Sequence, residues 1–114
     1  MKARVYNARF WTTASDAAFL RATIDAALRA SNFGILEFVE HAFEPYGYTA
    51  LWLLAESHCA IHTFPESGQA YIELTSCNRD KAEAFREQLN TRLWPQLEEY
   101  REDETENRTR PCQG

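Results

Sequence analysis

Length, composition and charge narrow the classes of protein that this chain can belong to. It has 114 residues, of which 45% are hydrophobic, and a formal net charge of −5 at pH 7. These values fit one domain, 1–114, with a packed core, and an acidic chain repels phosphate backbones, so we expect no nucleic-acid partner. The longest apolar stretch, residues 50–55, is too short for a membrane span, and MKARVYNARF has no apolar run typical of a signal peptide. Three cysteines without a CxxC pair indicate free thiols, and we therefore expect a cytoplasmic protein.

The first half of the chain predicts a strand, a helix and two further strands. Residues 4–12 mix aromatic and aliphatic residues with arginines, which is typical of a strand. Ser15 offers an N-cap for an amphipathic helix that ends near Ser31. Residues 35–43 predict a second strand. Residues 49–55 are apolar at both alternating sets of positions, which predicts a strand covered on both sides.

The second half predicts two more strands and a helix. The strands cover 58–64 and 70–77 and are joined by a tight connection, and the helix begins at about Arg79. Pro95 removes a backbone donor, so either a kinked helix or a terminal strand can follow it. Residues 102–114 are charged and polar and predict a loose tail. Together the elements predict an α+β fold, a two-layer sandwich of one antiparallel sheet with two helices on one face.

Residues 56–77 concentrate the groups that could carry chemistry, and three interpretations compete. A metal site would need His58 and His62 to converge, but on a strand they lie about 13 Å apart, so we expect no metal. A hydrolase would use Cys77 or Ser57 as nucleophile, yet no third residue stands out to orient a base. In the third interpretation the Ser57 hydroxyl attacks the carbonyl before it, and elimination then converts the serine into a pyruvoyl group. Spacing alone does not decide between them.

A longer pattern of motifs runs through the middle of the chain. It reads HAFEPYG from residue 41, ESH from residue 56, IHT from residue 61 and PE from residue 65, and it ends at Cys77. This combination resembles the processing and active-site region of the prokaryotic S-adenosylmethionine decarboxylases. The likeness runs without gaps from His41 to Cys77 and is weaker in the first helix and the C-terminal third.

The resemblance implies a pyruvoyl-dependent carboxy-lyase that is made as a proenzyme. The chain would cut itself between Glu56 and Ser57, giving a β chain, residues 1–56, and an α chain, residues 57–114. Ser57 would become the pyruvoyl cofactor, a ketone that forms a Schiff base with a substrate amine and accepts electrons as carbon dioxide leaves.

The same resemblance assigns roles in processing and turnover. His62 would take the α-proton of the ester intermediate during processing, a role that suits imidazole near neutral pH. Cys77 would be the general acid that protonates the substrate α-carbon. Thr49 stands where the family has a processing serine, and it keeps the hydroxyl.

Substrate binding is also implied by the resemblance. Phe43 occupies the position of the aromatic ring that stacks on adenine, Phe64 stands where Trp or Tyr is usual, and Glu66 would hold the ribose hydroxyls. The family implies a homodimer of αβ protomers, in which each active site borrows residues from the partner, and a product used for spermidine synthesis. Gln69 and Tyr71 depart from the family pattern. Two alternatives therefore stay open: a decarboxylase of ornithine or arginine with the same mechanism, and an unprocessed homologue that acts only as a binding or dimerisation partner.

Overall fold

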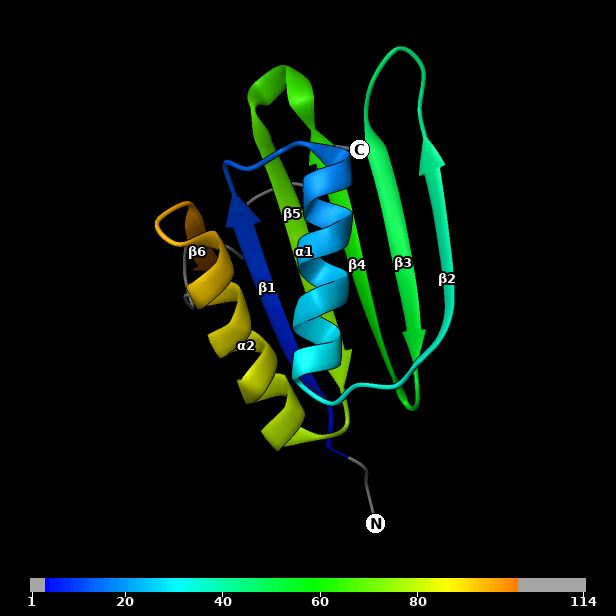
Figure 1. The fold of residues 1–114 in the computed structure, drawn as a ribbon, viewed down its shortest axis with the longest axis vertical. Helices are drawn as coiled ribbons and strands as arrows, with labels where there is room; N and C mark the ends of the chain where they lie inside the picture. Colours follow the sequence, from blue (N-terminus) through cyan, green and yellow to red (C-terminus); the bar gives the residue numbers. More distant parts are fainter. Residues whose placement is uncertain (1–3, 101–114) are drawn as a thin grey trace.

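One antiparallel six-stranded sheet carries two helices on one of its faces (Figure 1). The structure is a computed structural model that describes residues 4–100. Its elements are β1 Tyr6–Thr12, α1 Ala17–Ala30, β2 Ile35–Ala42, β3 Tyr48–Leu54, β4 Ser57–Phe64, a 3-10 turn Pro65–Ser67, β5 Gln69–Ser76, α2 Arg79–Leu93 and β6 Leu97–Tyr100. The strands lie in the order β2-β3-β4-β5-β1-β6. The predicted fold class is confirmed, and the predicted tail at 102–114 lies outside the described residues.

Strand alternation sorts the side chains of the sheet onto two faces. The buried core lies between one face of the sheet and the two helices, and its largest members are Trp52, Phe10, Leu54, Ile61, Ile72 and Leu74 of the sheet and Phe85, Leu20, Ile24, Leu28 and Leu89 of the helices. The opposite face, which we call the open face, is covered by no element among residues 4–100 (Figure 1). The prediction that 49–55 is covered on both sides is therefore wrong for the single chain, since Leu51 and Leu53 are 44% and 50% exposed. Both helices pack on the same side, so the second apolar set of β3 meets solvent.

The N-cap of the first helix lies one residue later in the chain than predicted. Asp16, and not Ser15, is the N-cap, because its carboxylate accepts a hydrogen bond of 2.9 Å from the backbone N–H of Phe19. The helix is fixed to the sheet by the indole Nε1 of Trp52, which donates to Asp25 at 3.2 Å. Neither helix of the described residues is long and apolar enough to cross a membrane.

The segment after Pro95 forms a strand, which decides between the two possibilities that the sequence left open. Strand β6 pairs antiparallel with β1 at the edge of the sheet. Arg86 of α2 holds it there, because the guanidinium contacts the Glu99 carboxylate at 2.8 Å and the Glu83 carboxylate at 2.8 Å. These two carboxylates raise the pKa of Arg86 against the opposing effect of its burial.

Candidate active site

The predicted cleavage bond lies in the tight turn between β3 and β4, at the lower end of the sheet in Figure 1. Glu56 occupies the turn with a φ of 56°, a left-handed conformation that a residue with a side chain rarely adopts. Such a conformation costs on the order of 1–3 kcal/mol. Ser57 follows as the first residue of β4. The residue before the predicted cleavage bond therefore has a strained backbone conformation.

The hydroxyl of Ser57 is buried and hydrogen-bonded. Ser57 is 8% exposed, and its Oγ donates to Oγ of Ser76 at 2.9 Å. Ser76 is fully buried, accepts the backbone N–H of Asn78 at 3.0 Å and donates to the Asn78 carbonyl at 3.3 Å. Because the hydrogen of Ser57 points to Ser76, the oxygen lone pairs remain for the neighbouring carbonyl carbon. Sequence reasoning missed Ser76, although the tight β4–β5 connection pairs it with Ser57.

A hollow of about 320 Å³ brings Ser57 together with Cys77. Glu56 and Lys81 also line it, and the ammonium of Lys81 lies 5.8 Å from the ring centroid of Phe33. Cys77 is a free, exposed thiol, so a small molecule in the hollow can reach it. We call Glu56, Ser57 and Cys77 the cleavage group.

The other predicted residues gather at the opposite end of the sheet. Phe43, Thr49, His62, Phe64 and Glu66 line a hollow of about 210 Å³, and we call them the aromatic group. Thr49 and His62 are paired residues on β3 and β4, and Oγ1 of Thr49 is hydrogen-bonded to Nδ1 of His62 at 2.9 Å. Phe43, Phe64 and Glu66 are exposed, which leaves them free to contact a ligand.

The two groups do not meet within one chain. Ser57 and His62 are five residues apart on the continuous strand β4, which corresponds to about 16 Å. Five is an odd number, so the Ser57 side chain lies on the buried helix side whereas His62 lies on the open face. The structure thus brings the predicted residues together as two separate sets and does not join the sets.

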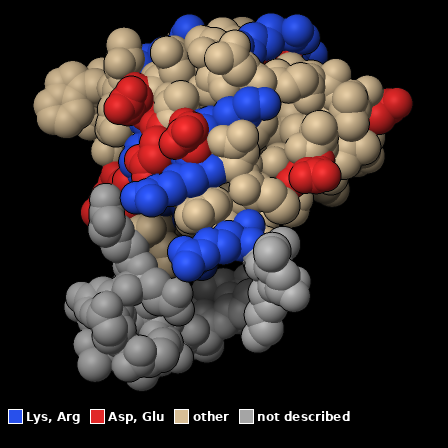
Figure 2. All heavy atoms as spheres, turned by 90° about the horizontal axis from the view of Figure 1, so that it is seen from below, with Lys and Arg blue, Asp and Glu red and all other residues tan. Residues whose placement is uncertain are grey.

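The other cysteine of the described residues, Cys59, is buried in the core. Burial raises the pKa of the Cys59 thiol well above its usual range, so this cysteine stays protonated and unreactive. Among residues 4–100 no three His, Cys, Asp or Glu side chains are grouped as metal ligands would be. Seen from the end of the sheet that carries the cleavage group, basic and acidic side chains lie next to one another and form no patch of one sign (Figure 2).

Comparison with solved structures defines the class of fold. The chain superposes on the crystal structure of the adenosylmethionine decarboxylase from Aquifex aeolicus with a TM-score of 0.71. The match covers 88% of this chain and 89% of that one at 24% sequence identity. It shows a shared two-layer fold.

Sequence comparison then gives the family. The family model for S-adenosylmethionine decarboxylase matches residues 6–105, and the chain belongs to this family. A relative named S-adenosylmethionine decarboxylase proenzyme, from Parasynechococcus marenigrum, is 50% identical over 62 residues, or 54% of this chain and 48% of the relative. Its namesake from Prochlorococcus marinus strain MIT 9313 is 48% identical over 63 residues, or 55% of this chain and 50% of the relative. The chain thus spans about half the length of the curated relatives it matches.

Proposed function

We propose that this chain is a self-processing, pyruvoyl-dependent decarboxylase that acts on S-adenosylmethionine, in the cytoplasm, to supply spermidine synthesis. Membership of the family supports the reaction. The observation that carries the proposal is the Ser57 hydroxyl, which is buried and oriented by Ser76 beside the strained Glu56 conformation. A surface serine at the start of an ordinary strand would need neither feature.

The proposed processing uses the positions of Glu56 and Ser57. Oγ of Ser57 attacks the carbonyl carbon of Glu56, the C–N bond breaks, and the proton of the hydroxyl moves to the released nitrogen, leaving an ester. A base then removes the α-proton of residue 57, and the Cβ–Oγ bond breaks to release Glu56 as a carboxylate. The dehydroalanine that remains hydrolyses to the pyruvoyl group with loss of ammonia. Relief of the left-handed Glu56 conformation favours the first step.

The base is His62 of a second copy of the chain. Within one chain the imidazole lies about 16 Å from Ser57 and on the other side of the sheet. A homodimer in which the aromatic group of one copy lies at the cleavage group of the other removes the separation along β4. Ser57 is the first residue of that strand and so lies at the end of the sheet, which a group of the second copy can approach around the turn. The open face supports such pairing, because Val39, Leu51 and Leu53 expose apolar surface there that a second sheet can bury.

The processed site would combine electrophile, acid and binding surface. A pyruvoyl ketone supplies a group that condenses with the substrate amine and accepts the electron pair left by carbon dioxide. The exposed thiol of Cys77 shares a hollow with residue 57, which supports its proposed role as the acid that returns a proton to the α-carbon. Phe43 and Phe64 offer rings to adenine, and Glu66 offers an acceptor to the ribose hydroxyls.

Intact mass measurement tests the cleavage. Freshly purified chain should convert without protease into fragments 1–56 and 57–114, the second lacking a free N-terminal amine. Ser57→Ala should stay full length, and Thr75→Ala, a neighbouring hydroxyl on the open face, should still be cut. A wild-type chain that releases carbon dioxide while remaining uncut would refute the pyruvoyl mechanism.

A substrate panel tests what the processed chain acts on. Release of carbon dioxide is followed from S-adenosylmethionine, ornithine and arginine in parallel. Turnover of ornithine or arginine without turnover of S-adenosylmethionine would refute S-adenosylmethionine as the substrate.

Co-expression tests the shared site. Ser57→Ala provides an intact His62, and His62→Ala provides an intact Ser57, so neither variant alone should mature. Expressed together with different tags, they should yield mature fragments from the His62→Ala chain only. If each wild-type chain matures as a monomer, or if the mixed variants stay immature, the base does not come from a second copy.

A further inference from the structure

We propose that Tyr71 is a positioning residue for His62, holding the imidazole in the orientation that proton transfer requires. This inference rests on the proposed role of His62 in processing. Tyr71 lies directly opposite His62 on the neighbouring strand β5, and both side chains are half-buried on the open face. Their rings are close to parallel, with an interplanar angle of 22° and centroids 6.4 Å apart.

His62 needs a second restraint besides its hydrogen bond. A swing of the ring about the Cβ–Cγ bond carries Nδ1 away from Thr49, and a single neutral hydrogen bond restrains that swing only weakly. For Nε2 to accept a proton, Nδ1 must carry the ring hydrogen and donate it to Thr49. A parallel ring on the other flank restricts the swing that would break this arrangement. Thr49 and Tyr71 thus hold His62 from the two adjacent strands.

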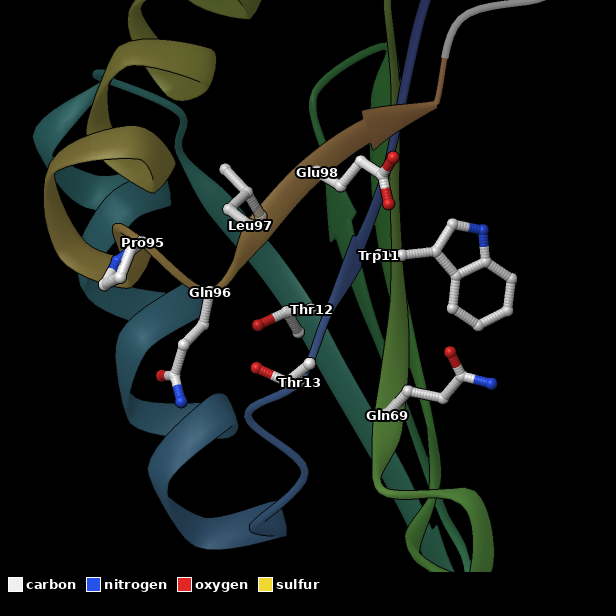
Figure 3. Close-up of a pocket in the computed structure, with 8 residues that line it drawn as sticks. All are labelled: Trp11, Thr12, Thr13, Gln69, Pro95, Gln96, Leu97 and Glu98. Atoms are coloured by element: carbon white, nitrogen blue, oxygen red, sulfur yellow. The ribbon is translucent and has the colours of Figure 1, made fainter.

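Tyr71 is itself held in place. Its hydroxyl donates to the Glu73 carboxylate at 2.9 Å, and the Trp11 ring packs against it with centroids 5.1 Å apart. Burial and the Glu73 carboxylate raise the pKa of Tyr71 to about 12, so the hydroxyl stays a donor throughout the physiological range. Figure 3 shows Trp11 directed to the side of the sheet away from the helices, the same side as Gln69 and Glu98. Trp11 also contacts Phe64, with ring centroids 6.1 Å apart.

The residues form one continuous row across four adjacent strands. Trp11 pairs with Tyr71, Tyr71 with His62, and His62 with Thr49, so all four side chains project at the same height on the same face. Each member contacts the next by a ring contact or a hydrogen bond. A tyrosine that only filled space would need neither a hydrogen-bonded hydroxyl nor an aromatic ring on each side. The row therefore gives Tyr71 a function in orienting the base.

Nitrogen NMR of the histidines tests the orientation without any need for catalysis. In uncut Ser57→Ala, the ¹⁵N shifts of His62, assigned by their loss in His62→Gln, report how much of the neutral ring carries its hydrogen on Nδ1. Tyr71→Leu should move these shifts toward those of a free imidazole, whereas Tyr71→Phe, which keeps the ring, should stay near the parent. Phe19→Leu removes an exposed ring on α1 and serves as the matched control.

Cleavage of the Ser57-containing chain gives the second measurement. Tyr71→Leu should mature about 2- to 13-fold more slowly, the range that an aromatic pair contributes, and Tyr71→Phe should recover most of the rate. Should Tyr71→Leu fail to fold, Trp11→Leu removes the ring that packs on Tyr71, together with its contact to Phe64, and carries the same expectation for the His62 shifts and the cleavage rate. Unchanged His62 shifts, or an unchanged rate despite shifted resonances, would overturn the proposal. A parent chain that never matures would instead refute the proposed function, while the NMR result would still decide the position of His62.

Discussion

Ser76 offers the sharpest test of how the structure prepares Ser57 for attack. Ser76→Ala deletes the acceptor that lies 2.9 Å from Oγ of Ser57 and the acceptor of the Asn78 backbone N–H at 3.0 Å. A neutral hydrogen bond contributes about 0.5–1.5 kcal/mol net. If the bond to Ser57 serves only to orient the nucleophile, its loss should slow self-cleavage by about 2- to 13-fold.

The assay separates this effect from a loss of folding. Cleavage of freshly purified Ser76→Ala is followed on denaturing gels against wild type and against Thr75→Ala. Urea unfolding is measured in the uncut Ser57→Ala background, where the bond between the two serines is already absent. There Ser76→Ala removes only the two hydrogen bonds to the Asn78 backbone and should cost about 1–3 kcal/mol. A normal cleavage rate in Ser76→Ala would show that the bond is structural and that the proposed orientation of Ser57 is wrong.

Three further predictions concern turnover, binding and stability. Cys77→Ala should still cleave itself but lose about 10²- to 10⁴-fold in carbon dioxide release; full turnover would remove the thiol from the acid role. Glu66→Gln should weaken turnover of S-adenosylmethionine by about 10- to 150-fold, the cost of a hydrogen bond to a charged group, with self-cleavage intact and Glu98→Gln as the exposed control. Trp52→Phe removes the indole donor to Asp25 at 3.2 Å and leaves space in the core, so urea unfolding should show a loss of about 2 kcal/mol. A change below about 0.5 kcal/mol would mean that this bond does not fix α1 to the sheet.

The sheet was predictable because its strands obey simple alternation and are separated by turn residues. The antiparallel order of β3, β4 and β5 follows from short connections, of which the 3-10 turn at Pro65–Ser67 ends at Gly68 with a φ of 67°. The strand after Pro95 was not decided by the sequence, because Leu97 and Tyr100 suit a helix face as well as an edge strand. The contact between Arg86 and Glu99, which joins segments that no spacing rule connects, favours the strand.

Two features of the site, its exposed sheet face and Tyr71, could not be predicted from the sequence, for physical reasons. The apolar residues Leu51 and Leu53 signal burial but do not say what covers them, so the open face of the single chain was missed. Tyr71 looks like any aromatic residue on a strand, and only the register between β4 and β5 places its ring beside His62. Motif reasoning finds residues by their type, whereas a positioning residue is defined by its neighbours.

The division of the site into two groups, in contrast, could have been read from residue numbers. Phe64 pairs with Gln69 at the β4–β5 connection, and counting back along both strands pairs Ser57 with Ser76. Cys77 must then lie beside Ser57, while His62, an odd number of residues away, must lie on the other face of the sheet. No change in twist or loop length brings His62 back to Ser57 while β4 remains one strand. If Ser57 and His62 act in one reaction, as we propose, His62 therefore has to come from a second copy of the chain, and the co-expression of Ser57→Ala with His62→Ala tests this consequence of strand geometry.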